Sequence, residues 1–341
     1  MFRIFRKKSG FKKGNFSSYK NLKNPKTVSI DISDICNLRC KICRQWKDRN
    51  KHKKLNIADI KKLIDQISRY FPSTLLEFSG QEPLLKKELL FDALEYAGKK
   101  KVSTALSTNG TLITEDVAKK LIRLKLHHIS VSLDGFEKTH NYIRNSVNAY
   151  EKVTKGLKNL IKYKNELKSD TAIAVTTVIT NLNIKELLPL YDYLKSIKVD
   201  CVNYNGYVLD NSYFFDPNAN YDNEFWIKKD NLPEFRNVIS RIIELKKKNS
   251  VPTITNDISQ LREMPEYFEL KEKFNKGYCL AGYNYFHITN FGEITVCGKG
   301  PKINIRNADL NKVWQSKEFF MTRKKVSECN APCLNNCFDL K

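Results

Sequence analysis

Cysteine spacing is the feature of this sequence with the most chemical content. The chain has nine cysteines, an odd number, and all but Cys201 fall into two groups near opposite ends of the chain. Cys36, Cys40 and Cys43 form the first group, and Cys279, Cys297, Cys329, Cys333 and Cys337 form the second. An odd count with such tight spacing does not indicate a disulfide framework. Thiols spaced in this way are typical of metal ligands or redox groups.

The first group places three thiols on one short loop. Three cysteines bind three irons of a four-iron, four-sulfur cluster and leave the fourth iron open to another ligand. A structural zinc site would require a closed set of four ligands, and His52 is the nearest candidate for a fourth. We therefore interpret Cys36, Cys40 and Cys43 as ligands of an open iron-sulfur cluster, with zinc binding or chance placement as the alternatives.

The elements that position this loop alternate between β-branched runs and amphipathic stretches, which predicts βαβ units and a parallel sheet. The predicted strands are Thr27–Ile32, Thr74–Phe78, Val102–Ser107, His128–Leu133, Ala172–Ile179 and Val199–Tyr204. The predicted helices between them are Ile57–Tyr70, Lys87–Gly98, Glu115–Leu124, Tyr150–Tyr163 and Ile184–Ser196. Another helix is predicted at Leu232–Lys248. Periodicity alone permits either a partial barrel or an open doubly wound sheet.

The cysteine loop resembles the CxxxCxxC signature of the radical S-adenosylmethionine (SAM) superfamily, in the loop after the first strand where that family carries it. The resemblance implies an α/β fold, a partial (β/α)6 TIM-type barrel. It also implies an enzyme that reductively cleaves SAM to a 5'-deoxyadenosyl radical, which abstracts a hydrogen atom from the substrate. The residue before the last cysteine is usually aromatic in the family, whereas this chain has Ile42.

Several later segments resemble family segments that line the SAM site. Ser79 to Pro83 resembles the GGEP motif, with Gln81 in place of the second glycine. Ser107 to Gly110 and Ser130 to Gly135 end the third and fourth predicted strands, at the sheet edge where α/β proteins bind ligands. The resemblance assigns to SAM binding Ile42, Gly80, Gln81, Glu82, Pro83, Ser107, Asn109, Ser132, Asp134 and Arg144. Glu82 is expected to pair with the SAM ammonium and Arg144 with its carboxylate.

His140 and Arg144 resemble the H-x-x-x-R that follows the fourth strand in relatives with a C-terminal cluster domain. A capping or packing role is the preferred interpretation of His140. Cys201, at the end of the sixth predicted strand, is interpreted as a small core residue.

The second cysteine group resembles a SPASM or twitch module, with a C-x(12)-G-x(4)-C opening from Cys279 to Cys297 and a closing C-x(3)-C. Asp309–Gln315 resembles the short helix of such modules. The resemblance implies one auxiliary 4Fe-4S cluster held by Cys279, Cys297 and Cys337, with Cys333 or Cys329 as the fourth ligand. Zinc is the competing metal, because thiolates suit both.

The predicted organisation is a basic N-terminal tail at 1–25, the barrel core at 26–204, barrel completion and a connecting region at 205–276, and the auxiliary module at 277–341. The formal net charge is +23, but the lysines are spread over helix faces, so specific nucleic-acid binding is not expected. No segment is apolar enough for a membrane helix, and the basic N-terminus has no apolar stretch behind it. These features predict a cytoplasmic protein.

Two substrate hypotheses stay open: a peptide or protein side chain, and a small molecule such as a sugar, cyclitol or cofactor precursor. The short segment before the first strand leaves no room for a fused leader-binding domain, which lowers the peptide hypothesis. In both, the family resemblance implies an external one-electron donor such as flavodoxin or ferredoxin. The alternative from another class is a non-enzymatic zinc-binding nucleic-acid module or an iron-sulfur electron carrier.

Overall fold

A computed structural model of the chain describes residues 24–47, 53–208, 222–269, 278–298, 300–301, 303–328, 334 and 338–339. The predicted basic tail and Cys329, Cys333 and Cys337 of the second cysteine group lie outside these ranges.

A curved nine-stranded sheet forms the centre of the described structure, in the order β10-β9-β1-β2-β3-β4-β5-β6-β7. The strands are β1 (Thr27–Ser33), β2 (Leu75–Gly80), β3 (Thr104–Thr108), β4 (His128–Ser132), β5 (Ala172–Ile179), β6 (Cys201–Gly206), β7 (Thr253–Ile254), β9 (Tyr285–Ile288) and β10 (Ile294–Thr295). Neighbouring strands from β1 to β7 pair in parallel, β9 joins β1 in parallel, and β10 pairs antiparallel to β9. The sheet does not close, which confirms the predicted partial barrel.

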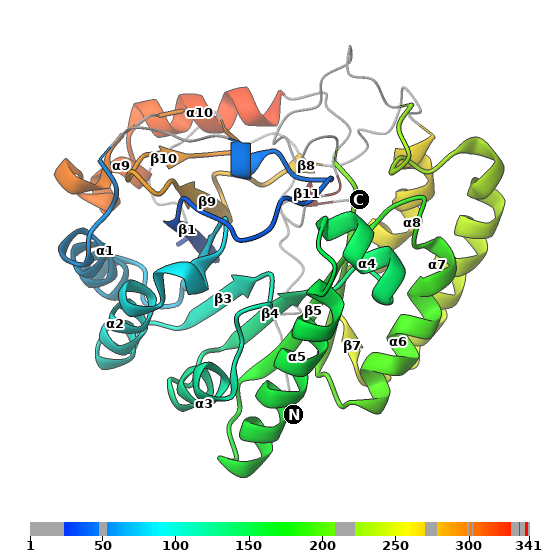
Figure 1. Ribbon diagram of the computed structural model, residues 1–341. Coiled ribbons are helices and arrows are strands. Elements are labelled where there is room, and N and C mark those ends of the chain that lie inside the picture. Colours follow the sequence, from blue (N-terminus) through cyan, green and yellow to red (C-terminus); the bar gives the residue numbers. More distant parts are fainter. Residues whose placement is uncertain are drawn as a thin grey trace.

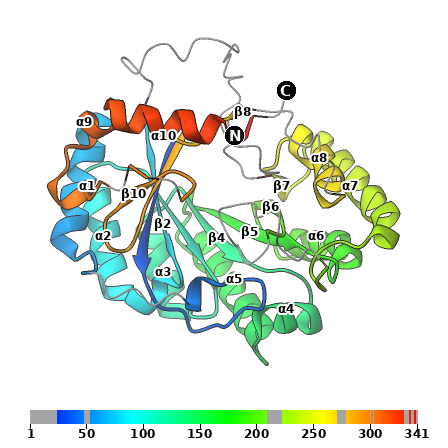
Figure 2. The same ribbon diagram turned by 90° about the horizontal axis from the view of Figure 1, so that it is seen from above.

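Helices cover the convex side of this sheet, as the view from above shows (Figure 2). They are α1 (Ile57–Tyr70), α2 (Lys87–Lys99), α3 (Glu115–Arg123), α4 (Glu137–Arg144), α5 (Ala149–Glu166), α6 (Leu187–Ser196), α7 (Leu232–Lys247), α8 (Ile258–Phe268), α9 (Leu310–Trp314) and α10 (Lys317–Ser327). Short 3-10 turns precede several of them, among them Pro83–Lys86 before α2.

Alternation along the strands explains why the interior of the curved sheet is polar. In β1, Val28 and Ile30 are fully buried, whereas Asp31 between Ile30 and Ile32 is partly exposed. Successive side chains of a strand point to opposite faces, so the apolar set of β1 packs against the helices and Ser29 and Asp31 face the barrel interior.

The predicted helices are found with shifts of a few residues at their ends, and α1 begins and ends where predicted. Three helices were not predicted as elements: α4, which carries the H-x-x-x-R spacing, and α8 and α10. Pro265 falls in the predicted connecting region at 205–276, but it lies inside α8. Pro disfavours a helix interior because it removes one backbone hydrogen bond and crowds the preceding turn. Burial of Leu261, Met264 and Phe268 on one face of α8 outweighs that cost.

The C-terminal segment is an integral part of the barrel wall. Ser29 to Ile30 of β1 pair with His287 to Ile288 of β9, which places the β9–β10 hairpin on the edge of the main sheet (Figure 1). Gly292 forms the hairpin turn with φ +92°, a conformation that glycine adopts without strain.

Arg306 links this segment to α1. Its Nε donates to Asp59 Oδ2 over 3.0 Å, and its terminal nitrogens donate to the carbonyl oxygens of Phe291 over 2.8 Å and Lys54 over 2.8 Å. Asp59 also closes the capping box of α1 with Asn56. One guanidinium therefore joins the hairpin turn, the chain before α1 and the first turn of α1.

Within the described ranges, no helix is both long enough and apolar enough to span a lipid bilayer.

We predict that Arg306→Ala loosens the C-terminal segment from the barrel. Losing charge-assisted hydrogen bonds to a partly buried group typically costs about 1.5 to 3 kcal/mol in the free energy of unfolding. Urea denaturation would measure this loss, and amide hydrogen exchange would show reduced protection in β9 and β10. The exposed Arg241→Ala on α7 is the matched control, and equal effects of the two changes would contradict this role of Arg306.

Candidate active site

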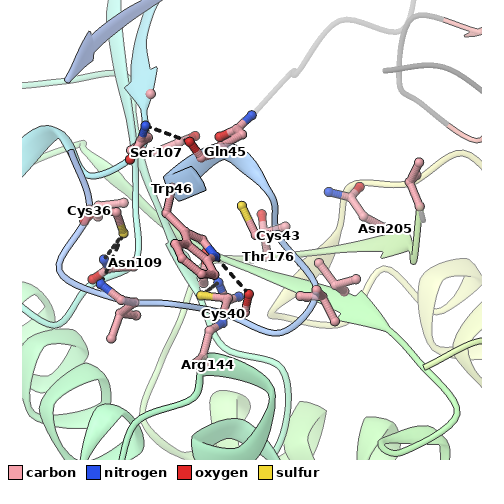
Figure 3. A pocket seen from close by; sticks show the side chains of 18 of the residues that line it. Cys36, Cys40, Cys43, Gln45, Trp46, Ser107, Asn109, Arg144, Thr176 and Asn205 are labelled. Atoms are coloured by element: carbon pink, nitrogen blue, oxygen red, sulfur yellow. Dashed lines mark hydrogen bonds between the residues drawn. The ribbon is translucent and has the colours of Figure 1, made fainter. Parts of the chain in front are cut away.

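One cavity of about 310 Å³ opens at the C-terminal ends of the parallel strands. The loop after β1 supplies Cys36, Cys40 and Cys43 to its wall, and Trp46 lies among them (Figure 3). The opposite wall comes from the ends of β3, β4, β5 and β6, through Ser107, Asn109, Ser132, Thr176, Val178 and Asn205. The cavity is therefore bounded by three thiols on one side and small polar groups on the other.

Nitrogen donors surround the thiols of Cys36 and Cys40. The Leu38 N–H lies 3.4 Å from Cys36 Sγ and Asn109 Nδ2 lies 3.8 Å from it, while Arg144 Nη1 lies 4.0 Å from Cys40 Sγ. Burial nevertheless raises the pKa of both thiols above its ordinary value. A positive charge in the cavity, such as that of a bound metal ion, would favour the thiolate form of both cysteines.

The three thiols are not grouped as the ligands of a single ion. Ligands of one tetrahedral zinc ion at the usual Zn–S distance lie about 3.8 Å apart. Among the described residues, no three His, Cys, Asp or Glu side chains are grouped in a way that would hold one metal ion. In a cubane each cysteine ligand binds its own iron, so the thiols need not converge on one point.

Gly80 lets the end of β2 approach the cysteine loop. It has φ +114°, and a Cβ at this position would lie 2.7 Å from the carbonyl oxygen of Ser33. No side chain larger than hydrogen fits there without moving the backbone. The next residue, Gln81, donates from its Nε2 to the carbonyl oxygen of Gln45 over 2.9 Å and so ties β2 to the loop a second time.

Glu82 lies behind the cavity wall and is fully buried. Its carboxylate accepts hydrogen bonds from Thr108 Oγ1 at 2.8 Å, from the Asn109 N–H at 2.8 Å and from the Leu84 N–H at 3.0 Å. Its own N–H donates to the carbonyl oxygen of Ile35 over 3.0 Å. The structure thus shows Glu82 joining β2, β3 and the cysteine loop. These three hydrogen bonds leave one of the roughly four acceptor sites of the carboxylate, on Oε2, for the predicted SAM ammonium.

Asp134 holds Arg144 at the cavity. Arg144 Nε donates to Asp134 Oδ2 over 2.7 Å, and the Val178 N–H donates to Asp134 Oδ1 over 3.0 Å. Arg144 lines the cavity below Cys40, whereas Asp134 is fully buried behind it (Figure 3). The i, i+4 spacing on α4 places His140 beside them.

His140 is neutral in this environment. Burial, together with the charge of Arg144, lowers its pKa to about 4. Its Nδ1 accepts a hydrogen bond from the Asp134 N–H at 3.1 Å, so the ring proton is on Nε2. Nδ1 also lies 3.9 Å from Asp134 Oδ2, but the two groups do not form an ion pair because the ring is neutral. His140 fixes the end of β4 from behind, as its packing interpretation predicted.

The structure brings most of the sequence-predicted residues to this one cavity. The residues that line it are Cys36, Cys40, Cys43, Ile42, Gly80, Gln81, Ser107, Asn109, Ser132 and Arg144. Glu82, Pro83 and Asp134 do not line the cavity. Glu82 and Asp134 position residues that do line it. Gln45, Thr176, Val178 and Asn205 line the cavity without having been predicted. Inward alternation along β5 and β6 is the signal that identifies the last three.

The sequence also did not lead us to predict a charged network in the barrel interior. Ser107 lines the cavity and donates to Glu77 Oε1 over 2.6 Å. Near Glu77, the Asp31 carboxylate accepts from Ser79 Oγ at 3.2 Å and lies 3.0 Å from His287 Nε2. Burial and the charge of Asp31 raise the pKa of Glu77, although the Ser107 hydrogen bond opposes this. Two carboxylates and one imidazole thus make the interior beneath the cavity acidic.

Cys279, the first cysteine of the second group, lies in a small two-stranded sheet. It belongs to β8 (Tyr278–Cys279), which pairs antiparallel with β11 (Phe338–Asp339), and its register partner is Phe338. Phe338 directly follows Cys337 in the sequence, and Cys337 itself lies outside the described residues. Cys297 lies just after β10 with φ +50°.

Arg323 is a fully buried cation in the same C-terminal segment. Its guanidinium stacks over Trp314 and Phe319, each with its ring centroid 4.3 Å away, and its Nε donates to the carbonyl oxygen of Gly282. Among the residues that the structure describes, its Nη1 has no hydrogen-bond partner, and burial lowers the pKa of the group to about 10. A Cβ on Gly282 would lie 3.0 Å from Arg323 and 3.3 Å from Val296, the neighbour of Cys297. A buried positive charge with an unused donor therefore lies close to the chain that carries Cys297.

Comparison with known families identifies residues 30–194 as a match to the radical SAM superfamily. Among curated proteins, an AdoMet-dependent heme synthase of Methanosarcina barkeri is 23% identical over 333 residues, covering 91% of this chain and 87% of the relative. An Fe-coproporphyrin III synthase of the same organism is 32% identical over 179 residues, covering 52% of this chain and 43% of the relative.

Solved structures share the fold over most of the chain. The AdoMet-bound enzyme anSMEcpe superimposes with a TM-score of 0.67 at 19% identity, covering 89% of this chain and 84% of the other. SuiB of Streptococcus suis, also bound to S-adenosylmethionine, gives a TM-score of 0.65 at 19% identity, covering 87% of this chain and 67% of the other.

We predict that Glu82→Gln destabilises the protein and disorders the cysteine loop. A glutamine amide turns one acceptor into a donor that faces N–H or O–H groups, and a buried donor left unsatisfied costs about 1 to 3 kcal/mol. Chemical denaturation would measure the loss. Glu88→Gln on the exposed face of α2 is the control, and a Glu82→Gln protein as stable as this control would contradict the clamping role.

Proposed function

Because the chain is a member of the radical SAM superfamily, a superfamily of enzymes, we propose that Cys36, Cys40 and Cys43 hold the 4Fe-4S cluster at which this enzyme uses SAM. When bound, the reduced cluster supplies the electron that cleaves SAM to methionine and a 5'-deoxyadenosyl radical, which abstracts a hydrogen atom from the substrate. The observation that carries this proposal is the single cavity that receives three thiols from one loop and polar groups from the ends of four parallel strands.

The chain's own residues bind and orient the ligands in this proposal. Arg144 has its Nε engaged by Asp134, which leaves its terminal nitrogens directed to the cavity, where they would meet the SAM carboxylate as well as Cys40. Asn109 and Ser132 offer hydrogen bonds to the remaining polar groups of SAM. Gly80 and Gln81 shape the backbone between the loop and the cavity. Trp46 provides an aromatic surface and takes the place of the missing aromatic residue before Cys43.

The interior beneath the cavity is the proposed place for the reacting part of the substrate. Asp31 and Glu77 favour a substrate group that donates hydrogen bonds, such as a hydroxyl or an ammonium. Peptide side chains and small molecules both offer such groups, so both substrate classes stay in the proposal. The relatives named as heme and Fe-coproporphyrin III synthases add a tetrapyrrole to the small molecules to be tested.

We further propose that the second cysteine group holds an auxiliary 4Fe-4S cluster, with Cys279, Cys297 and Cys337 as ligands and Cys333 or Cys329 as the fourth. The pairing of Cys279 with Phe338 supports this, since Phe338 is next to Cys337 in the sequence. The Nη1 donor of Arg323, which has no partner among the described residues, supports it as well, because nearby thiolate charge stabilises a buried cation. Such a cluster would accept an electron from, or bind, the substrate radical left by hydrogen abstraction, which agrees with an oxidoreductase or modifying enzyme.

Replacing Cys36, Cys40 and Cys43 together by Ala is predicted to abolish formation of 5'-deoxyadenosine and to remove about four irons per chain. Anaerobic reconstitution, iron analysis and chromatography of the SAM products would measure both. The matched control is Cys201→Ala, because Cys201 is a buried thiol of β6 whose pKa burial raises to about 11 and which does not line the cavity. Production of 5'-deoxyadenosine by the triple variant would overturn the assignment.

Replacing Cys279 and Cys297 by Ala is predicted to remove the auxiliary cluster and leave uncoupled SAM cleavage intact. Among the described residues, the cavity of the first cluster is lined only by residues from Cys36 to Val208, so no described residue of the second cysteine group belongs to its lining. Mössbauer spectroscopy would count the clusters, and circular dichroism would show whether the variant is folded, because metal binding contributes to the stability of small modules. A folded variant that retains both clusters would rule out these ligands.

A further inference from the structure

The cysteine loop has two chemically different faces. Cys36, Cys40 and Cys43 line the cavity, whereas Arg39, Lys41, Arg44 and Lys47 are exposed and contribute nothing to its wall. We call these four residues the cationic face. The sequence from Ile35 to Lys47 contains no aspartate or glutamate. A concentrated positive charge thus covers the outside of the loop that bears the predicted cluster ligands.

Aromatic rings contact three of these cations, Arg39, Lys41 and Lys47. The Arg39 guanidinium and the Lys47 ammonium each lie 5.3 Å from the centroid of the Trp46 ring, and Lys41 Nζ lies 3.3 Å from that of Tyr142. Arg39 Nη1 also donates to the carbonyl oxygens of Cys36 and Leu38. Contact with a ring face leaves the full positive charge, and no ion pair within the described residues neutralises Arg39, Lys41 or Lys47. The charge therefore remains available to a partner.

Exposed apolar side chains border the cationic face. Ile35 is 43% exposed and Tyr142 is 42% exposed, among the largest values for large apolar side chains in the described structure. Two acidic groups lie at this border: Glu224, which accepts a hydrogen bond from Tyr142 Oη at 2.7 Å, and Asp34, which precedes Ile35 and pairs with Lys54. Protein-protein interfaces combine apolar and aromatic side chains with a charged rim in this way.

We propose that the cationic face is the docking site for a small acidic electron-carrier protein with a flavin or iron-sulfur centre. The inference rests on the proposed function, which requires one electron at the cysteine site. That electron passes from the carrier, which is oxidised, to the cluster, which is reduced, and no bond or proton is exchanged. Opposite charges on the two proteins would steer their encounter and orient the carrier.

Trp46 makes this face suited to electron entry. Its Nε1 donates to the carbonyl oxygen of Cys40 over 3.3 Å, and its ring lines the cavity while two surface cations lie beside it. A carrier docked on Arg39 and Lys47 is separated from the thiols by little more than this ring and the loop backbone. A general excess of lysine would explain positive charge anywhere on the surface of the chain. It does not explain why the cations of Arg39 and Lys47 both lie beside the Trp46 ring.

The test compares two electron donors on the full-length, iron-reconstituted protein. Photoreduced flavodoxin is the acidic carrier, titanium(III) citrate is the small reductant, and anaerobic stopped-flow absorbance follows cluster reduction. The variant is Lys41→Glu with Lys47→Glu. Its control, Lys155→Glu with Lys158→Glu on the exposed face of α5, lowers the net charge by the same amount.

We expect the Lys41→Glu/Lys47→Glu protein to be reduced by flavodoxin about tenfold or more slowly than wild type at low ionic strength. The difference should shrink in about 0.5 M salt, because screening weakens steering between exposed charges. Reduction by titanium(III) citrate should be unchanged. Biolayer interferometry with oxidised flavodoxin should show the same loss of affinity, independently of turnover.

Three results would overturn the docking proposal. They are equal slowing in the Lys155→Glu/Lys158→Glu control, no reduction of wild type by flavodoxin while titanium(III) citrate succeeds, and a single-stranded oligonucleotide that binds this face more tightly than flavodoxin does. The last would assign the face to nucleic acid. A protein that binds no iron, or that titanium(III) citrate cannot reduce, would instead contradict the proposed function, so the two failures are distinguishable.

Discussion

The buried carboxylate of Glu82 is the constraint on which the site depends. A cysteine loop that follows a strand has no regular backbone partners of its own, so its position must be fixed from outside. Glu82 does this with its backbone N–H on Ile35, while its carboxylate gathers donors from the turn after β2 and from the end of β3. Such a group is costly to bury unless it is hydrogen-bonded. Because three donors from different segments converge on it, the loop and the strand ends form one unit, on which the positions of the cysteines and Asn109 depend.

Asp134 positions groups on the other side of the cavity in the same way, as a buried carboxylate that accepts several hydrogen bonds. It is buried, accepts from β5 through the Val178 N–H, and holds Arg144 toward Cys40. Neither carboxylate lines the cavity, and in this structure both orient groups that do line it. The polar interior beneath, with Asp31, Glu77 and His287, follows from the same alternation that places apolar residues against the helices.

The architecture was predictable because strand and helix periods alternate regularly between β1 and β6, and the cysteine spacing located the site within it. The features that could not be predicted from the sequence were hidden for physical reasons. α8 was obscured by Pro265, whose local penalty is outweighed by tertiary burial. The β9 pairing with β1 joins positions far apart in the chain, and no local pattern records it. The acidic interior was missed because Asp31 and Glu77 look like ordinary strand residues until His287 is brought beside them. The indirect role of Glu82 could not be read from its motif, since a motif gives position and not the direction of a side chain.

The pairing of β9 with β1 also sets the order in which the protein is completed during synthesis. Strand β1 is made early, yet its outer edge stays without its partner until residues 285–288 have left the ribosome. An unpaired strand edge invites association with other chains, and pairings between distant segments form slowly. The cysteine loop directly follows this strand. The nascent chain therefore passes through a stage in which its three thiols are present but one wall of the barrel is missing. Iron would be inserted most safely only after the last part of the chain has been added.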